Sequence, residues 1–138
     1  MTIQEKAQDI EDDFSFIEDW MEKYQLLIDL GKELEEMATD LKSDDNRIKG
    51  CQSQVWLHHS NSQADSIHFL ADSDAIITKG IISLLLKVVN GSSAKDVMNF
   101  DFNFIEKIGL KEHLSPTRAN GLTSMVKQIK FYALAISG

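Results

Sequence analysis

The sequence predicts an α+β domain in which several helices pack against a small three-stranded antiparallel sheet. Apolar residues recur at helical spacing near both ends of the chain, whereas residues 47–71 contain three short runs of alternating apolar and polar residues. Short turns between these runs favour antiparallel neighbours, and so small a sheet needs helices to cover one face. With 138 residues, of which 43% are hydrophobic, we expect one domain over residues 1–138.

Two helices are predicted before the sheet. Two pairs of residues have the spacing of a capping box: Thr2 with Glu5, and Ser15 with Glu18. The first helix should run to about Asp13 and the second should stop near Gly31. The apolar positions of the second helix share one face at a period of 3.6: Phe16, Ile17, Trp20, Met21, Tyr24, Leu27 and Ile28. Residues 32–47 have a mixed composition that predicts no single conformation.

The three predicted strands are Arg47–Lys49, Gln54–His59 and Ser66–Ala71, with a turn over residues 61–65. In the second strand Val55 and Leu57 alternate with polar or aromatic neighbours, so we expect these two on the core face. The third strand alternates in the same way. Its expected core residues are Ile67, Phe69 and Ala71.

The predicted helices after the sheet begin with one capped by Asp72 or Ser73, which runs from Asp74 to about Val89. This segment is apolar on nearly every side, which predicts the core helix of the domain. Two short helical turns follow in residues 92–110. Ser115 as cap with Pro116 at the first helical position then begins a last helix that ends near Ile136.

Charge and composition exclude several classes of function. The net charge is −8, and it is concentrated in residues 1–45, which opposes nucleic-acid binding. The acidic N-terminus does not resemble a targeting signal, and the longest apolar run, Gly80–Leu86, is too short to cross a bilayer. We therefore expect a cytoplasmic protein with no membrane contact. A single cysteine fits a reducing compartment and cannot by itself hold an iron–sulfur cluster.

Metal and hydrolase sites lack their usual signatures. Adjacent strand residues such as His58 and His59 point to opposite faces, so only one of them could join Cys51 or His68, and no bound metal is expected. No nucleophile elbow, phosphate-binding loop or dinucleotide turn occurs. Asp72 and Asp74 could form an acid–base pair, but their position favours a role at a helix N-terminus.

Cys51 remains as the candidate for chemistry. Gly50 beside it permits a tight turn that leaves the sulfur approachable, although a lone cysteine is more often a small buried hydrophobe. Its possible electrostatic partners are Arg47, Lys49 and Arg118. Arg118 lies in the first turn of the last predicted helix, where the helix dipole disfavours a cation. That position indicates either a role toward Cys51 or an ion pair with a surface carboxylate.

Residues 50–56, Gly-Cys-Gln-Ser-Gln-Val-Trp, resemble the signature of the SufE family of sulfur acceptors. Further blocks agree in order and spacing: residues 20–24 with 30–31, residues 72–75 with 79–80, residues 114–122, and more weakly residues 97–101. Together these blocks extend over nearly the whole chain. His58 and His59 depart from the pattern, because apolar strand residues are expected after Trp56.

The resemblance implies a persulfide carrier rather than an enzyme, with a fold similar to that of SufE and IscU-type proteins. Cys51 would accept sulfur from a SufS-type cysteine desulfurase, stimulate that enzyme, and deliver the sulfur to the SufBCD scaffold. Pyridoxal phosphate would belong to the desulfurase, so no cofactor is expected here. The residues assigned to the loop or the persulfide are Gly50, Gln52, Gln54, Arg118 and Lys49. Asp74 is assigned either to the docking surface or to capping.

Alternative interpretations remain at this stage. The chain could be a CsdE-type partner of a different desulfurase. It could also be a non-catalytic regulator that binds the desulfurase by shape, with Cys51 incidental. The oligomeric state is open, and a homodimer is possible.

Overall fold

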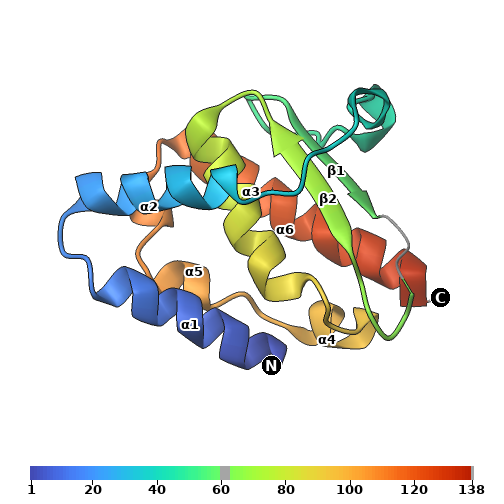
Figure 1. Ribbon diagram of the computed structural model, residues 1–138, viewed down its shortest axis with the longest axis horizontal. Coiled ribbons are helices and arrows are strands. Elements are labelled where there is room, and N and C mark those ends of the chain that lie inside the picture. Colours follow the sequence, from blue (N-terminus) through green and yellow to red (C-terminus); the bar gives the residue numbers. More distant parts are fainter. Residues whose placement is uncertain (60–62, 138) are drawn as a thin grey trace.

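The computed structural model describes residues 1–59 and 63–137. Its helices and strands, in chain order, are α1 (Ile3–Ser15), α2 (Trp20–Lys32), β1 (Val55–His59), β2 (Phe69–Ser73), α3 (Ile76–Val89), α4 (Ala94–Asn99), α5 (Phe104–Lys107) and α6 (Pro116–Ser137). Short 3₁₀ turns, η1 (Thr39–Leu41), η2 (Asp44–Asn46) and η3 (Lys111–His113), lie in the connections. The α+β class is therefore confirmed. Figure 1 shows α3 in the middle, with α1 and α2 on one side and the hairpin and α6 on the other.

Helix α3 forms the centre of the core, as its composition predicts. It packs against α1, α2, α6 and β2. Ten of its fourteen residues are buried, so water reaches almost no side of it. The predicted cap is wrong, however, because Asp72 and Ser73 belong to β2 and the helix begins after Ala75 without a side-chain cap.

The N-terminal helices follow the prediction in part. Thr2 and Glu5 form both hydrogen bonds of the capping box at 3.1 Å, so α1 begins as expected. The start predicted for α2 is wrong. Ser15 ends α1 and its hydroxyl donates to Asp12 O, whereas Asp19 accepts from the N–H of Met21 and caps α2. Phe16 therefore lies outside α2 and is 85% exposed.

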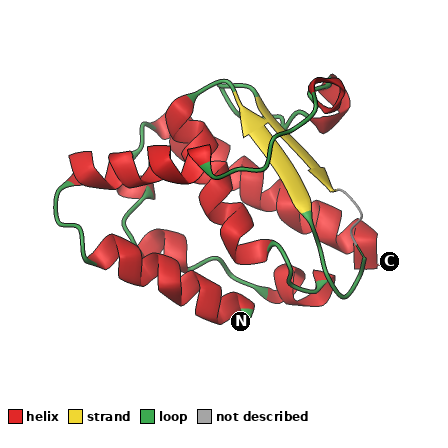
Figure 2. Cartoon of the chain, in the orientation of Figure 1, coloured by secondary structure: helices red, strands yellow, loops and turns green. Residues whose placement is uncertain are grey.

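The sheet has two strands in the described chain, not the three predicted. β1 and β2 pair in antiparallel register from Val55 opposite Ser73 to His59 opposite Phe69. The expected first strand contributes an isolated bridge between Arg47 and Trp56. Arg47 comes directly after the 3₁₀ turn η2, so the chain before it is not extended and cannot pair further with β1. Figure 2 shows the two strands as a single ribbon pair beside the helices.

The strand predicted at Ser66–Ala71 begins late, at Phe69. Ile67 pairs instead with the turn that follows α3: its N–H donates to Ser92 O at 2.9 Å, and its carbonyl accepts from the N–H of Gly91 at 2.8 Å. The alternation still predicts burial correctly, because Ile67, Phe69 and Ala71 are each at most 1% exposed. Part of the turn predicted over residues 61–65 lies outside the described residues.

The C-terminal helix α6 begins as predicted. Pro116 is its first residue, and the hydroxyl of Ser115 accepts from the N–H of Arg118 at 3.3 Å. The short helices α4 and α5 occupy the region of the two predicted turns. Among residues 1–59 and 63–137, no helix combines the length and the hydrophobicity that a bilayer span requires.

Candidate functional site

The loop that carries Cys51 joins Ile48 to the start of β1. Its two ends are held together because the N–H of Ile48 donates to the carbonyl of Val55 at 2.8 Å. Gly50 turns the chain with φ of +91°, a region that side chains rarely permit. A Cβ at this position would lie 2.5 Å from the hydroxyl of Ser124, so the turn also brings the backbone close to α6.

Cys51 is half-buried against α6. Its Sγ lies 3.6 Å from the carbonyl oxygen of Gly121, and a Cβ at Gly121 would lie 3.4 Å from the sulfur. A side chain as small as alanine at Gly121 would therefore stand in ordinary van der Waals contact with the thiol. Burial raises the pKa of Cys51 above its ordinary value, because a thiolate is poorly solvated there. In this conformation Cys51 is a protected thiol rather than an activated nucleophile.

A cavity of about 310 Å³ opens beside Cys51. Its walls come from the cysteine loop, from the first turns of α3 and from the N-terminal half of α6. The lining residues are Cys51, Gln52, Ser53, Thr78, Ile81, Ser115, Thr117, Arg118, Gly121 and Met125. None of these is acidic. The site therefore combines one nucleophilic sulfur, one cation and several hydroxyl groups.

Arg118 reaches this cavity from the first turn of α6, although it is 67 residues from Cys51 in sequence. Among the described residues it forms no ion pair, so the surface ion pair considered above is not present there. Its side chain is exposed. A cation held against the helix dipole with no carboxylate beside it is positioned to meet an anion in the cavity.

The remaining predicted site residues separate into two groups. Gln52 lines the cavity, and Gly50 shapes the turn, as described above. Lys49 and Gln54 are exposed and do not line the cavity. Gln54 acts through its backbone: its N–H donates to the carboxylate of Asp74 at 3.0 Å.

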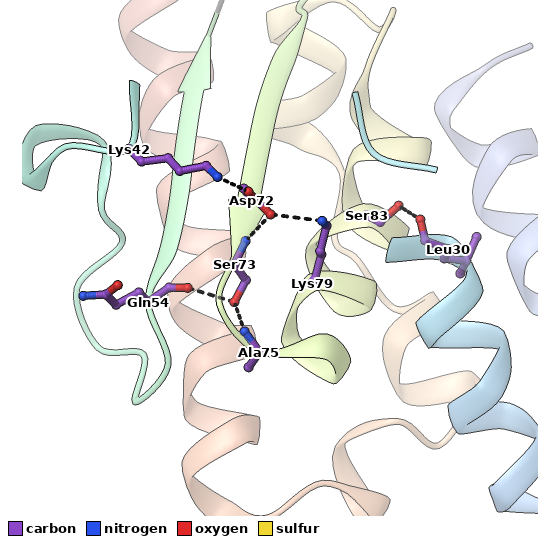
Figure 3. Close-up of polar contacts among 8 residues, drawn as sticks. All are labelled: Leu30, Lys42, Gln54, Asp72, Ser73, Ala75, Lys79 and Ser83. Atoms are coloured by element: carbon purple, nitrogen blue, oxygen red, sulfur yellow. Dashed lines mark hydrogen bonds and ion pairs between the residues drawn. The ribbon is translucent and has the colours of Figure 1, made fainter. Parts of the chain in front are cut away.

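Asp74 and its neighbour Ser73 fasten the end of the cysteine loop. The carbonyl of Gln54 accepts from the Ser73 hydroxyl at 2.8 Å and from the N–H of Asp74 at 3.2 Å. Figure 3 shows Ser73 between Gln54 and the N–H of Ala75, to which its hydroxyl oxygen also bonds at 3.2 Å. Asp74 has an exposed side chain, so it remains available to a partner. Its role in docking stays a prediction.

Asp72 does not act together with Asp74. Its carboxylate pairs with Lys42 at 2.7 Å and with Lys79 at 3.3 Å (Figure 3). Burial alone would raise the pKa of Asp72, but the bonds from Lys42, from the N–H of Ser73 and from Lys79 outweigh it, so the pKa is lowered. Asp72 is thus a structural anion that joins β2 to α3 and to the segment before η2.

The sequence blocks that resemble the family meet in space. Trp20 stacks on His113 with ring centroids 3.7 Å apart, and the hydroxyl of Tyr24 donates to the carbonyl of His113. These contacts hold the segment immediately before α6, and hence the turn that carries Arg118. In the same way Gly31 and Gly80 face each other where α2 crosses α3. The blocks therefore include residues that position the site as well as residues that form it.

Several lining residues were not predicted: Ser53, Thr78, Ile81, Ser115, Thr117, Gly121 and Met125. A glycine inside a long helical pattern indicates a close approach, so Gly121 carried a usable signal. Thr78 and Met125 carried no such signal, because the helical pattern does not distinguish them from core positions. Ser115 appeared only as a cap.

The histidines do not gather into a metal site. His58 and His59 stack on each other with centroids 5.9 Å apart, and His68 lies 3.2 Å from the carboxylate of Glu35. Across residues 1–59 and 63–137 there is no group of three or more His, Cys, Asp or Glu side chains arranged to hold a metal ion.

Comparison with known proteins gives a consistent result. The SufE family model, described as an Fe-S metabolism associated domain, matches residues 8–133. An uncharacterised SufE-like protein of Rhizobium meliloti is 41% identical over 123 residues, which cover 86% of this chain and 88% of that protein. A SufE-like protein of Rhizobium etli, also uncharacterised, is 43% identical over 123 residues, covering 86% and 83% respectively.

A solved structure supports the fold. The solution structure of a hypothetical protein from Thermus thermophilus aligns with a TM-score of 0.78 and covers 95% of each chain. Its sequence identity is 17%, so this similarity bears on the fold alone. Because the family model extends over most of the sequence and both Rhizobium proteins align along most of it, the chain belongs to the SufE family.

Proposed function

We propose that this protein carries sulfur as a persulfide on Cys51. The observation that supports this most directly is the position of the sulfur, half-buried at the edge of a cavity that also contains Arg118. Membership of a family associated with Fe-S metabolism supports the same role. The donor in this proposal is a SufS-type cysteine desulfurase, whose pyridoxal phosphate stays on that enzyme, and the acceptor is the SufBCD scaffold in the cytoplasm.

The transfer is an exchange between sulfur atoms with no net oxidation. The thiolate of Cys51 attacks the outer sulfur of the donor's cysteine persulfide, and a new bond forms between Cys51 Sγ and that sulfur. The bond to the donor cysteine breaks, and its electron pair leaves with the donor sulfur, which takes up the proton that Cys51 lost. One thiol is enough for this relay, and the chain has one cysteine.

Acceptance requires the cysteine loop to move. In the resting conformation burial keeps Cys51 protonated and restricts access to it. We propose that binding of the desulfurase swings the loop outward about Gly50 and the Gln54 anchor, which exposes the thiol. The carrier thereby keeps a reactive sulfur away from solvent between its two partners.

The direct test is to incubate the protein with desulfurase and cysteine and to weigh the intact chain. We expect a gain of one sulfur atom in the wild type and none in Cys51→Ser. A wild type that gains no sulfur but still raises desulfurase turnover would leave only the non-catalytic regulator. Recovery of the desulfurase by pull-down from the native cytoplasm distinguishes a SufS-type partner from a CsdE-type one.

The raised pKa of Cys51 predicts a displaced pH dependence of alkylation. Burial favours the neutral thiol, so the thiolate forms at higher pH in the folded chain than in the unfolded chain. We expect the midpoint of the iodoacetamide rate against pH to lie higher for the native protein than for the same protein in urea. Coincident midpoints would contradict the buried resting state, even if the absolute rates differed.

Removing the carboxylate of Asp74 should loosen the loop. Asp74→Ala deletes the acceptor for the N–H of Gln54, so we expect faster alkylation of Cys51 at neutral pH, by about threefold to tenfold. Asp9→Ala, which removes an equivalent charge from the exposed face of α1, serves as control and should leave the rate unchanged. Equal rates for both variants would show that the anchor does not restrain Cys51.

A further inference from the structure

The cavity beside Cys51 has room for more than one sulfur atom. Its volume is about 310 Å³, whereas a water molecule, which is similar in size to a sulfur atom, accounts for about 30 Å³ of liquid. A persulfide on Cys51 would therefore fill only a small part of the space. The remainder is large enough for a small organic molecule in contact with that sulfur.

One end of the cavity offers donors to an anion. Arg118 lines it without an ion pair in the described part of the chain. Thr117 also lines it, and its backbone N–H makes no backbone hydrogen bond there, whereas the N–H of Arg118 is already used by Ser115. Free N–H groups at the start of a long helix favour negative charge.

Thr78 is an independent sign that a ligand belongs here. The residue is only 6% exposed and lines the same cavity, yet its hydroxyl makes no hydrogen bond within residues 1–59 and 63–137. Every fully enclosed side-chain oxygen or nitrogen in those residues has a partner, so this unpartnered hydroxyl keeps some accessible surface, and the residue that carries it lines the cavity. A buried hydroxyl without a partner is suited to bind a polar atom of a ligand.

The rest of the lining defines the ligand further. Ile81 and Met125 are each 1% exposed and form the apolar wall of the cavity. No lining residue is acidic, so an ammonium group would find no counter-charge. These features fit a small molecule with one negative charge and a short apolar stem.

We propose that the cavity binds a small thiol that carries one carboxylate, and that this thiol can remove the sulfur from Cys51. The inference rests on the persulfide role proposed above. The carboxylate lies at Arg118 and the N–H of Thr117, and the stem follows the apolar wall. The thiolate attacks the outer sulfur of the persulfide, the bond to Cys51 Sγ breaks, and its electron pair remains on Cys51 as a thiolate. The product is an alkyl persulfide, and no oxidant or reductant is required.

The experiment compares two small thiols as acceptors from the persulfidated protein, 3-mercaptopropionate and neutral 2-mercaptoethanol. Each rate is divided by the rate of the same thiol with the persulfidated chain unfolded in urea, which removes differences in intrinsic reactivity. We expect the folded protein to favour the carboxylate thiol by about tenfold, with a rate that saturates and that butyrate inhibits. A normalised preference near one, without saturation, would overturn the inference.

Two variants test whether Arg118 is the source of the preference for the carboxylate thiol. Arg118→Gln should reduce the normalised preference to near one, even if it changes both rates, because the ratio isolates the carboxylate contact. Lys127→Gln removes an exposed cation from α6 outside the cavity and should keep the preference. A preference unchanged in Arg118→Gln would contradict the site. A wild type that never accepts sulfur from the desulfurase would instead contradict the proposed function, so the two failures are distinguishable.

Discussion

Gly80→Ala is expected to destabilise the protein by about 2 kcal/mol or more. The substitution would place a Cβ 2.0 Å from the carbonyl oxygen of Leu27 and 2.5 Å from the carbonyl carbon of that residue. Both atoms belong to the backbone of α2, so a side-chain rotation cannot relieve the overlap. Helices α2 and α3 would have to move apart, and the hydrogen bond from Ser83 Oγ to Leu30 O at 2.6 Å (Figure 3) crosses that same interface.

The direction of the stability change in Gly80→Ala distinguishes close packing from helix propensity. On helix propensity alone, alanine in place of a mid-helix glycine stabilises by about 1 kcal/mol. Thermal unfolding measures the sum, and a loss of about 2 kcal/mol corresponds to roughly 8 °C in Tm for a chain of this size. Gly121→Ala in α6 is the matched control, since its Cβ would lie no closer than 3.4 Å to another group. A Tm for Gly80→Ala at or above that of the wild type would contradict the close packing of α2 on α3.

Gly50→Ala is expected to displace the cysteine loop and to cost about 1–3 kcal/mol of stability. The backbone of Gly50 has φ of +91°, where an alanine is strained whatever space surrounds it. Its Cβ would also lie 2.5 Å from Ser124 Oγ. The loop can relieve the contact with Ser124 by moving away from α6, and it can relieve the strain at φ by changing its backbone conformation, so we expect faster alkylation of Cys51 together with the fall in stability.

A double-mutant cycle separates the two causes. Ser124→Ala removes the hydroxyl that the new Cβ would meet and leaves the backbone conformation of Gly50 unchanged. Combined with Gly50→Ala, it should recover the steric part of the loss but not the part due to φ. If the double variant recovered all of the lost stability, the loop would tolerate a side chain at this φ. The backbone conformation would then not explain why a glycine precedes Cys51.

Local sequence patterns predicted the elements whose causes are local. The capping box at Thr2 and the proline after Ser115 each fix a helix start through residues within one turn, and the structure confirms both. Alternating burial in β1 likewise follows from a period of two. The prediction of the α2 cap was wrong because Ser15 and Asp19 are both residue types that cap helices, and the local pattern does not decide between them.

The candidate site divides in the same way. The sequence by itself showed that the chain has one thiol, that the loop around it can turn at Gly50, and that this loop resembles that of one family. It did not determine what surrounds the sulfur. Thr78 comes to the cavity beside Cys51 from α3, and Arg118 and Gly121 come to it from α6, whose preceding segment is held by the contacts of Trp20.

Tertiary structure also decided the size of the sheet and the state of the thiol. The strand predicted at Arg47–Lys49 was reduced to a single bridge between Arg47 and Trp56, because strand pairing depends on how the whole domain packs and not on the alternation within one segment. The raised pKa of Cys51 arises from burial against α6, about seventy residues away in the chain. Residue identity therefore identified the one thiol of the chain, whereas long-range packing determined that this thiol rests half-buried beside a cavity.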